Sequence, residues 1–187
     1  MKQGGRGKGQ GAKIKEKAKK IKLLILDVDG VMTDGGIILD NNGNEFKRFH
    51  VRDGHGIKMA QRVGIIIAFL TGRESNVVSR RASELGVTDI FQGRKEKIIS
   101  YRELLNRYNL KDEEVAFIGD DVIDIPIMRC AGLSIAVSDA EEDVIKIADW
   151  VTKRAGGRGA VREAIEFILK SQGKWKELME KYNNNKT

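Results

Sequence analysis

The sequence has 187 residues, which is enough for one domain with a sizeable hydrophobic core and too few for two. Hydrophobic residues make up 41% and charged residues 33%, as in soluble globular proteins, and no apolar run approaches the ~18 residues of a membrane-spanning helix. No apolar segment follows the positively charged N-terminus, so we expect no secretory signal. The single cysteine, Cys130, excludes an internal disulfide; we expect it to be a small buried residue in a helix of a cytoplasmic protein.

The net charge of +7 belongs to the N-terminal segment and not to the body of the protein. Residues 1–22 hold nine of the 34 basic residues and one of the 27 acidic ones, which leaves 25 basic and 26 acidic residues elsewhere. We predict a disordered, Gly-rich basic tail over residues 1–12. A short docking helix follows over residues 13–22, with one apolar face formed by Ile14, Ala18 and Ile21. We favour a solvated tail, and binding of a polyanion is the alternative.

Residues 13–187 are expected to form a single α/β domain. Continuous apolar runs typical of strands buried on both faces occur at Leu23–Leu26, Ile65–Leu70, Val115–Ile118 and Leu133–Val137. Apolar residues at helical spacing occur between or after these runs, at residues 59–63, 77–85, 98–108 and 161–169, and a C-terminal helical tail covers residues 172–187. This alternation predicts right-handed crossovers and a mostly parallel sheet in a Rossmann-like three-layer sandwich.

One stretch interrupts the alternation directly after the first buried run. Gly36–Leu39 and Glu45–Val51 are β-prone and flank Asp40-Asn41-Asn42-Gly43-Asn44. Asn-Gly between two such runs is a strong hairpin signal, so we predict a β-hairpin over residues 36–51. This insertion is too small to form a separate lid, and the sequence contains no large cap domain.

Polar residues follow the buried strands, where an open parallel sheet binds its ligands. Asp27-Val28-Asp29-Gly30 follows the first run, Thr71-Gly72-Arg73 the second, and Gly119-Asp120-Asp121 the third, with Asp124 one helical turn further on. Lys97 lies near the start of the helix that follows Val87–Phe91. We therefore expect four acids, a hydroxyl and a cation to converge on one edge of the sheet.

This set of residues suits phosphoryl transfer. Crowded carboxylates repel one another, and oxygen ligands alone select a hard cation such as Mg²⁺. The metal and Lys97 would neutralise phosphate charge, and Thr71 could donate a hydrogen bond to a phosphate oxygen. A carboxylate such as Asp27 can be the nucleophile that forms an acyl phosphate. A second acid two residues on, Asp29, can protonate the leaving oxygen and later activate water.

Each residue also has a simpler interpretation. Asp27 alone could be a helix cap, Thr71 an ordinary turn residue and Lys97 a solvated helix residue, so their functional interpretation depends on the combined pattern. Asp121 and Asp124 could be capping acids at a helix start. His50 and His55 lack metal-ligand spacing to another His or Cys, and we interpret both as structural or surface residues.

Four segments resemble, in this order, the four motifs of the haloacid dehalogenase-like superfamily. They are Asp27-Val28-Asp29-Gly30-Val31, Thr71-Gly72-Arg73, Lys97 and Gly119-Asp120-Asp121-Val122-Ile123-Asp124. The resemblance covers about residues 21–170, and its first and last motifs are the specific ones. An Asp-X-Asp motif with a catalytic second aspartate marks the phosphotransferase branch and not the dehalogenases.

Within the superfamily, five segments look like those of the family of 3-deoxy-D-manno-octulosonate 8-phosphate phosphatases. These segments are LDVDGVMTDG, FHVRDGHGIKMA, LTGRES, GDDVIDIPIM and AGGRGAVREA. The resemblance implies Mg²⁺ bound by the Asp27 and Asp120 carboxylates and the Asp29 carbonyl, with Asp121 and Asp124 as nearby acids. It implies Asp27 as nucleophile, Asp29 as general acid and base, and Thr71 and Lys97 as phosphate ligands. Candidate substrate-binding residues are Arg52, Arg73 and Arg158. The charged N-terminal tail departs from the family pattern.

The same resemblance implies a homotetramer in which the hairpin and the C-terminal segment help to close a neighbour's site. The expected reaction is hydrolysis of the 8-phosphate of an eight-carbon sugar acid in lipopolysaccharide precursor synthesis. A nine-carbon sugar acid 9-phosphate is the nearest competing substrate, because the catalytic motifs contact only the phosphate. The chain could also be a tetramerising module without catalysis, which the intact Asp27 and Asp29 argue against, or a polyanion-binding protein. We expect neither a membrane nor nucleic acid as partner.

Overall fold

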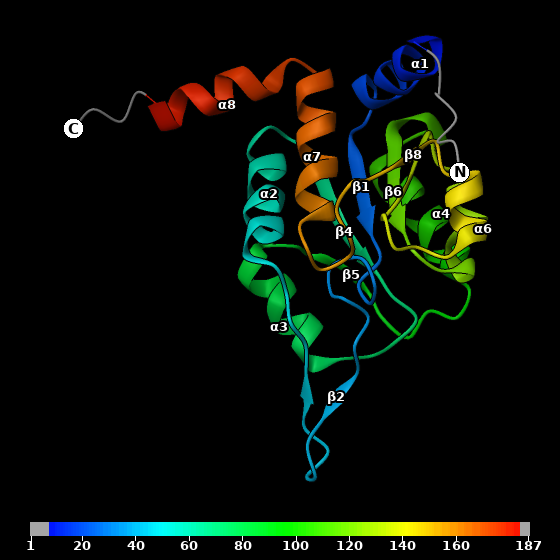
Figure 1. Ribbon diagram of the computed structural model, residues 1–187, viewed down its shortest axis with the longest axis vertical. Coiled ribbons are helices and arrows are strands. Elements are labelled where there is room, and N and C mark those ends of the chain that lie inside the picture. Colours follow the sequence, from blue (N-terminus) through cyan, green and yellow to red (C-terminus); the bar gives the residue numbers. More distant parts are fainter. Residues whose placement is uncertain (1–7, 184–187) are drawn as a thin grey trace, which may run out of the picture.

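The computed structural model describes residues 8–183 of the chain. Its centre is a parallel six-stranded sheet in the order β5-β4-β1-β6-β7-β8 (Figure 1). The strands are β1 (Leu23–Leu26), β4 (Ile66–Leu70), β5 (Asp89–Phe91), β6 (Val115–Gly119), β7 (Leu133–Ala136) and β8 (Trp150–Val151). The chain adds β4 and β5 on one side of β1 and then crosses to add β6, β7 and β8 on the other, which confirms the predicted α/β fold. The short edge strand β8 was not predicted.

Helices cover both faces of the sheet. They are α1 (Lys8–Lys19), α2 (Val51–Arg62), α3 (Asn76–Leu85), α4 (Lys97–Tyr108), α5 (Ile125–Met128), α6 (Glu142–Ile147), α7 (Ala160–Ser171) and α8 (Lys174–Asn183). Helices α2 and α7 lie side by side in front of the sheet, and α7 also packs against α1 and α8 (Figure 1). Helix α5 packs against α4, α6 and the strands β6 and β7. Within residues 8–183, every helix is too short or too polar to span a lipid bilayer.

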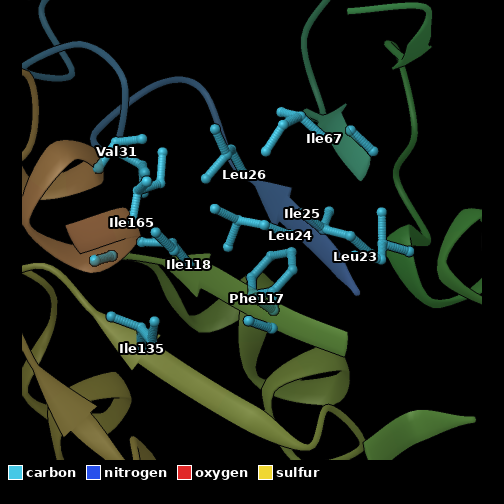
Figure 2. Packing of buried hydrophobic residues seen from close by; sticks show 14 of the residues in the cluster. Leu23, Leu24, Ile25, Leu26, Val31, Ile67, Phe117, Ile118, Ile135 and Ile165 are labelled. Carbon is cyan, nitrogen blue, oxygen red and sulfur yellow. The ribbon is translucent and has the colours of Figure 1, made fainter. Parts of the chain in front are cut away.

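The central strands are apolar on both sides because each side faces a helical layer. All four residues of β1 are fully buried, and they lie among Ile67, Phe117, Ile118 and Ile135 from the neighbouring strands (Figure 2). Removing this apolar surface from water is the main term that stabilises the sheet. The register aligns Leu26, the last residue of β1, with Phe69 of β4 and with Ile118 of β6. The chain segments that leave these three strands therefore start at the same edge of the sheet.

The predicted hairpin is present and extends beyond this edge (Figure 1). It consists of β2 (Ile38–Leu39) and β3 (Glu45–Phe46), which pair antiparallel with Ile38 opposite Phe46. The side chain of Asp40 closes the turn by accepting hydrogen bonds from the backbone N–H groups of Asn42 and Asn44, both at 2.8 Å. The strands are shorter than we predicted, because the chain leaves β3 after Phe46 and starts helix α2 at Val51.

Two expectations about secondary structure were wrong. Helix α1 begins at Lys8, so residues 8–12, which we predicted to be disordered, are helical; residues 1–7 lie outside the described part of the chain. The predicted apolar face is present, because Ala18 and Ile21 are buried and Ile14 packs against the core. Cys130 is half-buried in a turn just after α5 and not within a helix, because the four-residue helix α5 ends at Met128.

Candidate active site

Three polar segments meet at the carboxyl edge of the sheet because β4, β1 and β6 are neighbours. Asp27 directly continues β1, and its backbone N–H donates to the carbonyl of Ile118 at 3.1 Å. Thr71 continues β4, with its N–H bonded to the carbonyl of Phe91 at 2.9 Å, and Asp120 follows β6. The predicted convergence is therefore present for the acids and the hydroxyl.

Lys97 supplies the predicted cation. It starts helix α4, its side chain is 2% exposed, and its Nζ donates to Asp27 Oδ1 at 2.6 Å and to Asp124 Oδ1 at 2.7 Å. Burial alone would lower the pKa of Lys97, but the charges of Asp27 and Asp124 outweigh it and raise the pKa, so the ammonium stays charged. A lysine buried between two carboxylates differs from the solvated helix residue that the sequence alone allowed.

Asp124 has two structural contacts in addition to Lys97. It is fully buried, and its Oδ2 accepts hydrogen bonds from the backbone N–H groups of Asp120 at 3.0 Å and Asp121 at 3.4 Å. Asp124 thus fixes the loop after β6 and also holds Lys97. Asp121 is exposed, and its Oδ1 caps the 3₁₀ turn Val122–Asp124 by accepting from Val122 N–H at 2.6 Å. The capping interpretation therefore describes Asp121 and only part of the role of Asp124.

Oxygens of Asp27, Asp120 and Asp124 lie within 4.8 Å of one another. Burial, and then repulsion from the neighbouring carboxylates, raise the pKa values of Asp27 and Asp120. Oδ1 of Asp120 is buried and has no hydrogen-bond partner among the described residues. Crowded acids with an unpaired oxygen fit a divalent cation that prefers oxygen ligands. Because both oxygens of Asp124 already accept hydrogen bonds, Asp27 and Asp120 are the freer ligands.

Gly30 is required for this arrangement. It has φ +91°, and a Cβ at this position would lie 2.0 Å from Oδ2 of Asp120. Only glycine therefore lets the loop after β1 pass close to the carboxylate that follows β6. The short loop brings the Asp27-Val28-Asp29-Gly30 segment and Asp120 to one site, although they are distant in the sequence.

Asp29 lies on the same loop and contacts a lysine that the sequence analysis did not identify. Nζ of Lys47, from the hairpin, bonds to Oδ1 of Asp29, and the Lys47 side chain is 1% exposed. Glu45, the first residue of β3, lies 3.3 Å from Lys47. The alternation Glu45-Phe46-Lys47 at the start of the predicted β-prone run was the available signal, because side chains two residues apart in an extended segment lie on one face, opposite the exposed Phe46.

Thr71 and Arg73 lie beside these acids. Thr71 is buried, and its hydroxyl oxygen accepts from the backbone N–H of Arg73 at 3.3 Å. The Arg73 guanidinium lies 3.1 Å from Glu45 and 3.8 Å from Asp29 Oδ2, with its side chain 42% exposed. Arg73 is therefore the candidate substrate arginine that the structure brings to the acids.

The other two candidate arginines lie further out. Arg52 is exposed in the first turn of α2 and makes no ion pair or side-chain hydrogen bond within residues 8–183. Arg158 lies 3.6 Å from Asp34 and its side chain is 57% exposed. The glycines before Arg158 pack on the loop after β1: the N–H of Gly157 donates to the carbonyl of Val31 at 2.9 Å. The structure thus brings Arg158 to this loop, but not into contact with Asp27.

The chain is similar to known proteins in sequence and in fold. The model of the haloacid dehalogenase-like hydrolase family matches residues 66–165. The 3-deoxy-D-manno-octulosonate 8-phosphate phosphatase KdsC of Escherichia coli (strain K12) is 50% identical over 157 residues, which are 84% of this chain and 84% of that protein.

Solved structures agree over most of the chain. The 3-deoxy-D-manno-octulosonate 8-phosphate phosphatase from Yersinia pestis has a TM-score of 0.87 at 46% identity and covers 88% of this chain and 89% of its own. The enzyme of that name from Moraxella catarrhalis, solved with magnesium ion, phosphate ion and a KDO molecule, has a TM-score of 0.89 at 41% identity. That likeness covers 90% of this chain and 97% of the Moraxella chain.

Proposed function

The chain belongs to the haloacid dehalogenase-like hydrolases, and we propose that it hydrolyses 3-deoxy-D-manno-octulosonate 8-phosphate to the free sugar acid and phosphate. The observation that carries the phosphatase chemistry is the buried Lys97 between Asp27 and Asp124, with Asp120 beside them at the carboxyl edge of the sheet. The similarity to phosphatases of that substrate, one of them solved with magnesium, phosphate and KDO, supports the same substrate here.

The cofactor is Mg²⁺, and we propose the carboxylates of Asp27 and Asp120 and the main-chain carbonyl of Asp29 as its ligands. When bound, the ion neutralises charge on the transferring phosphoryl group. Asp121 and Asp124 remain close to these ligands without binding the metal. Lys97 adds a second positive charge and, with the Thr71 hydroxyl, binds the phosphate oxygens.

The covalent steps then require two carboxylates. A carboxylate oxygen of Asp27 attacks phosphorus, and the bond from phosphorus to the sugar oxygen breaks. Asp29, as the general acid, gives a proton to that oxygen, so the sugar leaves as a neutral hydroxyl. Asp29 then accepts a proton from water as the water oxygen attacks the phosphorus of the acyl phosphate. Asp27 is released as a carboxylate, together with inorganic phosphate.

We propose that Arg73, Arg52 and Arg158 bind the sugar acid. A guanidinium pairs with a carboxylate through two parallel hydrogen bonds, and Arg73 already lies between Asp29 and Glu45. The proposed place of the reaction is lipopolysaccharide precursor synthesis in the cytoplasm, which agrees with a free cysteine and a phosphorylated substrate.

The proposed assembly is a homotetramer held partly by the hairpin. Ile37, Ile38, Leu39 and Phe46 are each more than half exposed, which is unusual for adjacent large apolar residues on a single chain. Because the hairpin extends from the carboxyl edge, a neighbour docked on it would lie near the active site (Figure 1). We propose that such a neighbour completes the enclosure, since residues 8–183 contain no large cap domain.

A panel of phosphorylated sugar acids tests the substrate. Purified protein with Mg²⁺ is expected to release phosphate from 3-deoxy-D-manno-octulosonate 8-phosphate with the highest kcat/KM, and Asp27→Asn is expected to release none. A higher kcat/KM with a nine-carbon sugar acid 9-phosphate would contradict the substrate but keep the chemistry. Activity that survives in folded Asp27→Asn would contradict the covalent route.

A further inference from the structure

Lys47, at the base of the hairpin, has its side chain buried at the active site without belonging to any of the four motifs. This side chain is 1% exposed, although the neighbouring Phe46 and Arg48 are largely exposed. Burying an ammonium group is costly unless it is paired with opposite charge. Lys47 is paired with Asp29 and with Glu45, so the cost is offset by contacts within the site.

Lys47 contacts one of the two carboxylate oxygens of Asp29. Among the described residues it donates the hydrogen bond that Oδ1 of Asp29 accepts, while Oδ2 is buried and accepts none. Arg73 lies 3.8 Å from Oδ2, which is beyond hydrogen-bond distance. One oxygen of Asp29 is therefore held by Lys47, and the other stays available to exchange a proton with a substrate oxygen or with water.

Glu45 keeps Lys47 in place. Its carboxylate lies 3.3 Å from Lys47 and 3.1 Å from Arg73, and it accepts a hydrogen bond from the Ser75 hydroxyl at 2.5 Å. Ser75 is also the N-cap of α3, so this network connects the hairpin to an element that packs on the sheet domain. The charges of Asp29 and Glu45 therefore compensate the buried ammonium of Lys47, while Arg73 lies at the exposed side of the same network.

From this geometry we propose that Lys47 is a positioning residue: it fixes the Asp29 carboxyl so that its free oxygen meets the leaving oxygen in the first step and water in the second. This inference rests on the proposed function, because it assigns Lys47 to the proton transfers of Asp29. It also makes the hairpin part of the catalytic apparatus. A lysine that instead bound the transferring phosphate would contact Asp27, or Asp124, which bonds to Lys97. Lys47 contacts neither of them; it contacts Asp29 and Glu45.

The test uses two substrates that differ in their need for a proton. Loss of the sugar hydroxyl requires an acid, whereas 4-nitrophenolate leaves without one. In Lys47→Met, kcat for the sugar acid phosphate is expected to fall by about 10²-fold, the size of a general-acid contribution, with KM within about threefold. The burst of 4-nitrophenolate that accompanies aspartyl-phosphate formation is expected to keep its wild-type rate within about threefold.

Three further variants complete the design. Lys146→Met, which removes an exposed lysine on α6, is the matched control and should behave as wild type. Lys47→Arg should recover part of the lost kcat, because it restores the charge and the hydrogen bond. In an Asp29→Asn background, Lys47→Met should cause no further loss in the burst or in the residual turnover, since its effect acts through Asp29.

The outcomes separate the inference from the proposed function. The burst of 4-nitrophenolate could slow in Lys47→Met as much as turnover does, or Lys47→Met could lower turnover further in the Asp29→Asn background. Either result would show that Lys47 binds phosphate and would overturn the inference alone. Wild-type protein without an Asp27-dependent burst would overturn the covalent route, and the inference would fall with it. Thermal unfolding of each variant checks that the hairpin remains folded.

Discussion

Lys97 donates hydrogen bonds to Asp27 at 2.6 Å and to Asp124 at 2.7 Å, and all three side chains are almost completely buried. The lysine therefore stabilises two carboxylates that would otherwise repel each other in an apolar setting. Removing one partner of such a buried pair is strongly destabilising, because the remaining charge has no compensation.

We expect Lys97→Met to abolish phosphatase activity and to lower the free energy of unfolding of the metal-free protein by about 3–5 kcal/mol at pH 8.5. Saturating Mg²⁺ should recover part of this loss, since the cation also compensates the acids. Urea unfolding with and without Mg²⁺ measures both effects. Lys146→Met, whose ion pairs are exposed, should leave the unfolding midpoint unchanged. Equal stability of Lys97→Met and wild type without metal would contradict the role of the ion pairs.

The pH dependence of metal-free stability follows from the same acids. In the folded state burial raises the pKa of Asp27 to about 7 and that of Asp120 to about 8, from an ordinary value of 3.8. A raised carboxyl pKa means that the folded state binds more protons than the unfolded state at a pH between the two pKa values. The contribution of Asp27 and Asp120 to the free energy of unfolding is therefore complete below pH 3.8. It decreases as the pH rises and is lost once the pH has passed the folded pKa values of about 7 and about 8. Mg²⁺ binding requires the ionised carboxylates and opposes that loss.

Mg²⁺ is therefore expected to raise Tm more at pH 8.5 than at pH 5.5. Thermal unfolding at several pH values, with Mg²⁺ or with a chelator, measures the difference. In Asp120→Asn, which removes one of the two titrating acids and a metal ligand, the increment from Mg²⁺ should be small at every pH. An increment that does not change with pH in the wild type would contradict the placement of the metal on Asp27 and Asp120.

Gly30→Ala tests the close approach of the loop after β1 to Asp120. The added Cβ would meet Oδ2 of Asp120 at 2.0 Å, so either the loop or the carboxylate must move. We expect the variant to fold, to bind Mg²⁺ at least about tenfold more weakly, and to lose most of its activity, as displaced ligands usually cause.

The matched control is Gly64→Ala. Gly64 has a similar backbone conformation, with φ +83° against +91°, but a Cβ there would meet no atom within 4 Å. Both variants share the strain of a positive φ, which destabilises by about 1 kcal/mol. Only Gly30→Ala should change Mg²⁺ affinity. Unchanged Mg²⁺ affinity in Gly30→Ala would mean that the loop can shift without moving the metal ligands.

The parts of the site that the sequence predicted are those fixed by the order of the strands. Asp27, Thr71 and Asp120 each follow a continuous apolar run, and parallel strands place the ends of such runs at one edge. Lys97 was identified from the combined motif pattern, although its burial between two acids could not be read from its spacing. These residues could be identified because local sequence patterns place them, and the tertiary structure keeps that placement.

The remaining features depend on contacts between distant segments. Lys47 reaches Asp29 only because the hairpin folds back toward the loop after β1, and a sequence pattern does not specify that direction. The two-residue strand β8 is too short to show periodicity, and it pairs at the edge because β7 offers it a partner. Helix α1 extends to Lys8 through a segment whose glycines favour disorder.

The exposed apolar residues of the hairpin lead to a prediction about assembly. Ile38 and Phe46 are cross-strand partners and are 52% and 54% exposed. Replacing both by Glu puts two like charges on the surface that we propose to be buried between subunits. The double variant Ile38→Glu/Phe46→Glu is therefore expected to sediment as a smaller species than the wild type at the same concentration. Sedimentation velocity and light scattering measure the change.

Activity should fall with the loss of assembly if a neighbour helps to close the site. We expect kcat/KM of the double variant to fall by at least about tenfold, mainly through KM, because the catalytic groups of Asp27, Asp29 and Asp120 stay on one chain while the enclosure is lost. Asn42→Glu, at the exposed turn of the same hairpin, adds charge without touching the apolar pair and should keep both the wild-type size and activity. A double variant that is monomeric and fully active would show that each chain builds a complete site. A double variant that keeps the wild-type size would show instead that this surface is not buried between subunits.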